Sequence, residues 1–365
     1  MRSTGSVVIG GTAGVRPSVD IDGSTKPRFD VEHNSPSRRC RCERYLMTDV
    51  KHYLVGEHVE DFNSGLISRR ELLRRVTLIT GSIASTVVFL EVAGCQSEPS
   101  GQPPSPASRQ ASTPQPFATP PAQPTTDGVT VRPDDPRITI ARMKVTGTDS
   151  ASLISYHARP ASGEPAGGIL VVHENRGLVT HIEDVVRRVA TAGFSAVAVD
   201  LLSRQGGAGK LSDPAEYAAV LSKQDPMAMV SDLQQALAAM SAAGPGDRLG
   251  MTGFCFGGGM TWNALAAATA VKAAVPFYGP PPKNLAGLAT TKAAVLAIYA
   301  ERDTRITSTK DEIAQQLSRT GRPYQINVCP GVDHAFHNDT GPRYNATQAE
   351  AAWVATINWF HQYVR

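Results

Sequence analysis

The sequence of 365 residues has few cysteines, and their number and spacing argue against two common uses of this residue. There are five, an odd number, and the last three (Cys95, Cys255 and Cys329) are not spaced as a disulfide framework. Cys40 and Cys42 have no matching second pair. A zinc site built from paired cysteines is therefore not expected.

An excess of charge of one sign is also missing. The formal net charge is only +3, and the basic residues gather near the N-terminus, in "SRRCRCERY" and "SRRELLRR". No basic face interleaved with aromatic residues is present, so we expect no nucleic-acid partner. His334 and His337 have an H-x-x-H spacing, but they follow a predicted strand and do not fit the helical H-E-x-x-H pattern. We expect neither a metal nor another cofactor.

Long apolar runs are absent as well, and the longest one has the setting of an export signal. This run, from Val76 to Leu90, is shorter than the ~20 residues that span a bilayer. Before it, "SRRELL" resembles a twin-arginine motif through Arg69 and Arg70. After it, "VAGC" resembles a lipoprotein processing box that ends at Cys95. Residues 68–95 are thus predicted to be a signal segment. Cleavage without lipidation, or an ordinary amphipathic helix, are the alternatives.

The segments around this signal are expected to lack a packed core. Residues 1–67 are interpreted as a leader that is disordered or partly a misassigned start, with Met47 as the alternative start. Residues 96–137 are rich in Pro, Ser, Thr, Gln and Ala, a composition typical of an extended tether. We therefore expect an exported protein at the cell envelope or at the periplasmic or extracellular face. Its partners would be the export machinery and, through lipid on Cys95, the membrane.

Residues 138–365 predict an α/β domain. Short apolar runs alternate with helical patterns, which indicates a mostly parallel twisted sheet with helices on both faces. The first two runs have little between them and predict an antiparallel edge. Ligands of such sheets bind at the carboxyl ends of the strands. Five reactive residues directly follow predicted strands: Glu174, Arg204, Cys255, Asp303 and His334.

The stretch "GFCFG" at residues 253–257 places Cys255 between a predicted strand and a predicted helix. This arrangement has the G-x-nucleophile-x-G form of a nucleophile elbow, in which glycines let strand and helix approach closely. The N–H of Phe256, at the start of the helix, is then a natural donor to an oxyanion. Asp303 and His334 follow in the chain order of α/β-hydrolases, as acid and base. The alternative for Cys255 is a buried cysteine in a glycine-rich turn.

Together, "HENRGL", "DLLSRQG", "GFCFGGG", "AERDTRI" and "GVDHAFHND" resemble the dienelactone hydrolase family, thiol hydrolases with the α/β-hydrolase fold. The resemblance covers residues 138–365. It implies that Glu174 hydrogen-bonds the resting thiol and that Arg204 holds a substrate carboxylate. The family has a second carboxylate-binding arginine four residues after the histidine; here Asn338 occupies this position and is the substrate-binding candidate there. Arg343 is a candidate to replace it.

These residues predict a hydrolase that opens a lactone or ester through Cys255, His334 and Asp303, with an acyl-thiol intermediate. The substrate is a small molecule. The family resemblance implies a conjugated enol-lactone, and the departure at Asn338 leaves room for other esters. Two alternatives stay open: a broad carboxylesterase or thioesterase using the same site, and a hydrolase-fold binding lipoprotein without turnover.

Overall fold

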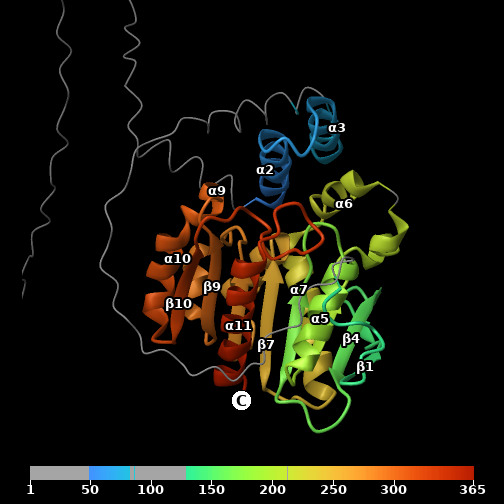
Figure 1. Cartoon of the computed structure of the whole chain (residues 1–365), viewed down its shortest axis with the longest axis vertical. Coiled ribbons are helices and arrows are strands. Elements are labelled where there is room, and N and C mark those ends of the chain that lie inside the picture. Colours follow the sequence, from blue (N-terminus) through green and yellow to red (C-terminus); the bar gives the residue numbers. More distant parts are fainter. Residues whose placement is uncertain (1–48, 83–85, 87–128, 212) are drawn as a thin grey trace, which may run out of the picture. The chain divides into compact units, whose positions relative to one another are not determined.

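The computed structural model describes residues 49–82, 86, 129–211 and 213–365 (Figure 1). Its centre is an eight-stranded sheet with the order β1-β4-β6-β5-β7-β8-β9-β10. β4 is antiparallel to both of its neighbours, and the pairs from β6 to β10 are all parallel. The strands of this sheet are β1 (Ile138–Ala141), β4 (Ser155–Pro160), β5 (Gly168–Val172), β6 (Ser195–Val199), β7 (Leu249–Phe254), β8 (Ala273–Phe277), β9 (Ala294–Ala300) and β10 (Tyr324–Cys329). A separate hairpin pairs β2 (Val145–Thr146) with β3 (Ser152–Leu153).

Helices cover both faces of the sheet. Crossovers between parallel strands are right-handed, and the chain steps from β5 to β6 in one direction but from β6 to β7 in the other. The connecting helices α5 and α7 therefore lie on opposite faces (Figure 1). The helices of the domain are α5 (Thr180–Thr191), α6 (Pro214–Leu221), α7 (Pro226–Ala242), α8 (Phe256–Ala266), α9 (Thr304–Thr307), α10 (Lys310–Leu317) and α11 (Ala346–Tyr363). Short 3₁₀ turns are η1 (Ser203–Gln205), η2 (Ala208–Lys210), η3 (Leu285–Thr290) and η4 (Ser318–Thr320).

The sheet confirms the α/β fold predicted from the sequence. The central strands β5 to β9 are buried along their whole length, as their continuous apolar runs indicate. The antiparallel edge is also present, with β4 between β1 and β6. The apolar run over residues 138–145 is split between β1 and the small hairpin. The folded part also begins earlier than residue 138, because the buried Val131 donates its N–H to Asp184 on α5 over 2.8 Å.

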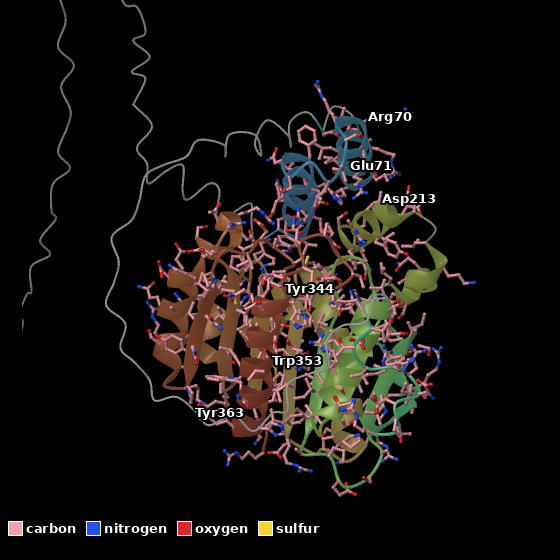
Figure 2. All side chains as sticks on the ribbon, in the orientation of Figure 1. Arg70, Glu71, Asp213, Tyr344, Trp353 and Tyr363 are labelled. Carbon is pink, nitrogen blue, oxygen red and sulfur yellow. The ribbon has the colours of Figure 1, made fainter. Side chains whose placement is uncertain are left out.

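Two helices form within the segments expected to be a leader and a signal: α2 (Val50–Asn63) and α3 (Arg69–Thr80). Asp49 and Ser68 cap their N-termini through side-chain oxygens. On α3, Arg74 bonds both Glu71 and Asp213. Figure 2 labels these two acidic residues, Glu71 on α3 and Asp213 directly before α6. The leader is thus helical over residues 50–63. The predicted lipidation site Cys95, residues 1–48 and most of the predicted tether lie outside the described residues.

Among the helices that the structure describes, none combines the length and the apolar character needed to cross a bilayer.

Candidate active site

Cys255 lies at a sharp turn between β7 and α8. Its φ of 56° and ψ of −120° are unusual for a residue with a side chain, and such values are found at nucleophile elbows. The turn depends on its two glycines. A Cβ on Gly253 would lie 2.2 Å from the carbonyl oxygen of Gly257, and one on Gly257 would lie 2.3 Å from that of Val172. The side chain of Cys255 is thereby presented at the carboxyl edge of the sheet, as predicted.

His334 and Asp303 form a buried pair close to this thiol. Asp303 follows β9 and caps α9, and His334 lies in the loop after β10. The imidazole Nδ1 is 2.6 Å from a carboxylate oxygen of Asp303, a short charge-assisted hydrogen bond. A ring nitrogen of His334 and the sulfur of Cys255 are within 4.8 Å of each other. The structure therefore brings the three residues predicted as nucleophile, acid and base together.

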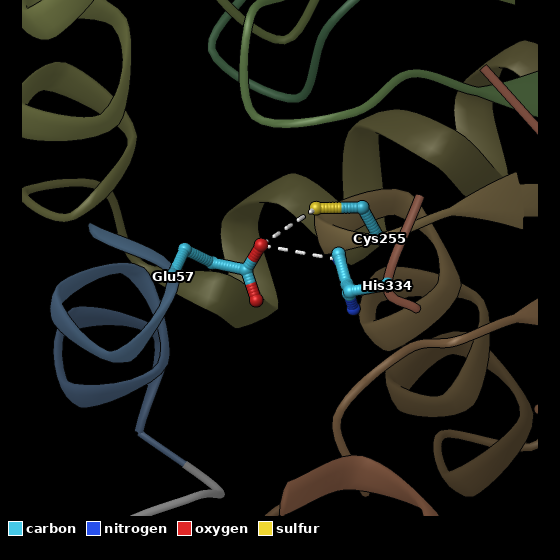
Figure 3. A group of neighbouring side chains, drawn as sticks. All are labelled: Glu57, Cys255 and His334. Atoms are coloured by element: carbon cyan, nitrogen blue, oxygen red, sulfur yellow. Dashed lines mark hydrogen bonds and ion pairs between the residues drawn. The ribbon is translucent and has the colours of Figure 1, made fainter. Parts of the chain in front are cut away.

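The thiol of Cys255 is covered by α2. The hydroxyl of Tyr53 lies 3.1 Å from the sulfur, and the thiol donates to the carboxylate of Glu57 over 3.7 Å. The same Glu57 oxygen is 3.1 Å from Nε2 of His334, although the two atoms are not aligned for a hydrogen bond (Figure 3). Glu57 therefore lies between the predicted nucleophile and the predicted base.

Burial and the Glu57 carboxylate both raise the pKa of the Cys255 thiol, against the opposing effect of His334. Burial disfavours a charged imidazole at His334, but Glu57 and Asp303 outweigh it and raise the pKa of His334 well above its ordinary value. The pKa of Glu57 is lowered, because His334 and Arg305 overcome the cost of its burial. With α2 in place, the site thus favours a neutral thiol beside a protonated imidazole.

Glu174 does not have the contact predicted for it. Its carboxylate accepts a hydrogen bond from the amide of Asn338, and its other oxygen is buried without a hydrogen-bond partner. Both residues were predicted to act directly, Glu174 on the resting thiol and Asn338 on the substrate, but here they bond each other. The carboxylate that accepts from the thiol is Glu57.

Arg204 was predicted to bind a substrate carboxylate, and the structure gives it protein carboxylates instead. Its guanidinium bonds Asp232 on α7 over 2.6 Å and Asp149, between β2 and β3, over 2.7 Å. The Asp232 side chain is 1% exposed, so Arg204 neutralises a buried charge. Each nitrogen of the Arg204 guanidinium therefore already donates to a protein carboxylate.

Arg204→Met is expected to lower the free energy of unfolding by about 2–3 kcal/mol, because Asp232 would be left buried without its cation. The KM for a carboxylate-bearing ester should not change. Thermal melts and steady-state kinetics on the same preparation would check both expectations. A rise in KM without loss of stability would return Arg204 to the substrate site.

Arg305 and Arg343 are the cations that meet α2 at the site. Arg305 forms ion pairs with Glu57 and, over 3.2 Å, with Glu60. Arg343, the candidate replacement for the arginine missing at position 338, bonds Asp61 over 2.9 Å. Arg343, which was predicted, and Arg305, which was not, are thus both paired with acidic side chains of α2.

The group of Glu57, Cys255 and His334 has the ligand types that zinc uses, with one ligand atom from each within 4.8 Å of the others. Two contacts weigh against a cation there. Arg305 already places a positive charge on the Glu57 carboxylate, and Asp303 holds Nδ1 of His334. The other histidine considered in the sequence, His337, is packed among Phe254, Phe277 and Trp353.

Sequence reasoning missed three residues around the thiol: Tyr53, Glu57 and Tyr278. The ring of Tyr278 packs edge-on against His334, with centroids 4.9 Å apart. Tyr53 and Glu57 are four residues apart in "YLVGE" and so share one face of α2. This spacing was the available signal, but the segment was interpreted as a leader outside the folded domain.

Known proteins resemble this chain over its α/β domain. A model described as the dienelactone hydrolase family matches residues 153–364. A Methylorubrum extorquens protein provisionally named carboxymethylenebutenolidase is 36% identical over 254 residues, covering 66% of this chain and 87% of the relative. An Escherichia coli K12 protein with the same provisional name is 32% identical over 258 residues, covering 67% and 94%.

A solved structure gives the same result. The crystal structure of a Klebsiella pneumoniae protein, provisionally named dienelactone hydrolase, matches with a TM-score of 0.56 and 32% identity. The match covers 62% of this chain and 99% of that one. Fold, site order and relatives agree, and the chain belongs to the dienelactone hydrolase family of lactone and ester hydrolases.

Proposed function

We propose that the protein hydrolyses a small-molecule lactone or ester through a Cys255 nucleophile, with His334 as base and Asp303 as its orienting acid. The observation that carries the proposal is the Cys255 thiol at a strained strand–helix turn, within reach of an imidazole that a buried carboxylate holds by one nitrogen. This is the arrangement of an activated nucleophile.

The reaction follows in two steps. When Glu57 is not bound at the site, His334 takes the thiol proton and the sulfur attacks the ester carbonyl carbon, forming a C–S bond. The C–O bond to the leaving oxygen then breaks, and His334 returns the proton to that oxygen. In the second step His334 takes a proton from water, whose oxygen attacks the acyl-thiol. The C–S bond breaks, the carboxylic acid is released, and His334 returns the proton to the sulfur, which regenerates the thiol.

The N–H of Phe256 supports the charge that develops on the carbonyl oxygen. Phe256 is the first residue of α8, where a backbone N–H has no acceptor within the helix. The positive end of the helix dipole lies at the same place. The turn that positions the sulfur therefore also supplies a donor for the oxyanion.

An acyl-thiol intermediate is expected on Cys255 with a slowly hydrolysed ester. Rapid acid quench and mass spectrometry of the Cys255 peptide would detect the added acyl mass, and the panel would hold a dienelactone, aryl esters and an acyl thioester. The buried thiol of Cys329 is the control in the same protein. Turnover without an acylated Cys255 peptide would count against the covalent route. Folded protein without turnover on the panel would favour a binding role.

We also propose that the chain is exported through a twin-arginine signal and processed near Cys95. Arg69 and Arg70 support this proposal, since both are exposed at the start of α3. Arg69→Lys with Arg70→Lys is expected to keep the protein inside the cell. Cys95→Ser should remove any lipid while leaving export intact, and the mass of the mature N-terminus would show which processing occurs.

A further inference from the structure

Helix α2 buries five of its side chains against the catalytic domain. The buried residues are Tyr53, Leu54, Val55, Glu57 and His58. Tyr53 and Glu57 reach the reacting groups themselves, whereas the aliphatic residues pack in the main apolar core. A surface helix need not bury a carboxylate, because doing so costs free energy unless the charge is paired. The placement of Glu57 therefore requires an explanation.

The two oxygens of the Glu57 carboxylate contact the proposed nucleophile, the proposed base and Arg305. One oxygen faces the Cys255 sulfur and Nε2 of His334, and the other forms the ion pair with Arg305. A substrate carbonyl cannot reach the sulfur while this carboxylate and the Tyr53 hydroxyl lie against it. The raised pKa values of Cys255 and His334 point the same way, because attack needs a thiolate and a neutral imidazole.

The guanidinium of Arg305 pairs with two carboxylates of α2. It is held almost entirely by α2: Glu57 and Glu60 pair with its charge, and the Tyr53 ring stacks on it with 5.1 Å from the guanidinium carbon to the ring centroid. Its Nε and Nη1 atoms are buried and have no hydrogen-bond partner among the described residues. Removal of the helix would leave a guanidinium with unused donors two residues from Asp303.

We propose that α2 occupies the substrate site as an internal competitor, and that Arg305, which pairs with the Glu57 oxygen pointing away from the thiol, binds the carboxylate of an anionic ester or lactone when α2 withdraws. This inference rests on the proposed hydrolysis. It assigns anion recognition to Arg305, since Arg204 and Asn338 are bonded to other protein groups. Arg343 adds a second positive charge once Asp61 leaves with the helix.

The position of α2 in the chain gives a route for its removal. The helix precedes Cys95, so the processing proposed above would separate it from the catalytic domain. A folded precursor would then carry an occupied site until it is cut. Glu57 is thus part of the segment that is lost.

The first test measures occlusion without any substrate. In the full chain, Glu57→Gln is expected to raise the rate of Cys255 alkylation by iodoacetamide about tenfold to a hundredfold, because the loss of a charged contact increases the open fraction. Glu71→Gln makes the same chemical change on α3, where the contacts are Arg74 and Arg75, and should leave the rate unchanged. Unchanged labelling of Cys329 reports an intact fold. Equal Cys255 labelling of parent and Glu57→Gln would overturn the occlusion.

The second test measures anion recognition in the Glu57→Gln protein. Succinate is expected to protect Cys255 from iodoacetamide, whereas the neutral succinamide should not. Addition of Arg305→Met should abolish the protection, and Arg305→Lys should retain part of it. Arg302→Met is the matched control, because Arg302 is 62% exposed and pairs with Asp333. Protection that survives Arg305→Met would overturn the assignment of Arg305.

The same variants separate this inference from the proposed hydrolysis. Monophenyl succinate carries the negative charge that Arg305 would bind, and its methyl ester replaces that charge by a neutral ester; release of phenol reports hydrolysis of the shared phenyl ester in both. In the Glu57→Gln protein, Arg305→Met should raise the KM of the charged ester at least about tenfold and affect the neutral ester much less. Hydrolysis that depends on Cys255 without these effects would leave the function standing and reject the inference. If Cys255 is labelled and protected as expected but neither ester is hydrolysed, the proposed hydrolysis is rejected and the anion site at Arg305 is kept.

Discussion

Cys255→Ala is expected to lower kcat/KM for every lactone or ester that the protein hydrolyses by at least about 10⁴-fold. Removal of the sulfur leaves His334 and Asp303 without a nucleophile to activate, and a water molecule does not replace an atom placed by the turn between β7 and α8. The comparison is best made both in the parent and in the Glu57→Gln background, so that α2 does not mask the difference. Steady-state rates with the preferred member of the ester panel would give the ratio.

Cys329→Ala is the matched control for this prediction. Cys329 is the other free thiol in the described part of the chain, and it is also buried, at the end of β10. Its loss removes a similar side chain without touching the site, and rates per folded molecule should stay near those of the parent. Hydrolysis that survives Cys255→Ala would mean that another residue supplies the nucleophile.

Gly257→Ala is expected to destabilise the protein by at least about 3 kcal/mol and to abolish hydrolysis in any molecules that still fold. The added methyl group would meet two backbone oxygens, those of Val172 at 2.3 Å and His173 at 2.5 Å. Backbone atoms of a central strand and its loop cannot move aside as a flexible side chain does, so α8 would have to shift and carry Cys255 with it. Chemical denaturation would measure the loss.

Gly209→Ala provides the comparison for Gly257. No atom lies within 4 Å of the position that its Cβ would take, and it is exposed in η2. We expect a change in stability within about 0.5 kcal/mol and unaltered kinetics. Similar losses in the two variants would show that the close approach of α8 to β5 is not what constrains residue 257.

The catalytic side of the site follows from local patterns in the sequence. Gly253 and Gly257 mark a turn that only glycine permits, and the apolar runs before Cys255 and Asp303 end where the buried strands β7 and β9 end. Parallel strands carry such residues to the same edge, whatever their separation in the chain. Local pattern and topology therefore suffice to locate Cys255, Asp303 and His334.

Partners chosen by long-range packing could not be predicted in this way. Glu57 lies 198 residues from Cys255 in the chain, and Arg204 lies 55 residues from Asp149. No spacing rule connects such pairs. Family resemblance assigned Glu174 and Arg204 roles that depend on what faces them, and here they face Asn338 and two aspartates. The motif identifies the residue, whereas its neighbours decide what it binds.

The contact between Tyr53 and Cys255 joins residues 202 positions apart within a single chain. Binding of α2 at the site is therefore an intramolecular equilibrium. The effective concentration of the helix sets its position, and flexible connections give values that reach the millimolar range. An uncut chain holds the same fraction of closed molecules at every protein concentration. After a cut beyond α3, the helix becomes a separate ligand, and simple dilution then determines how many active sites are open.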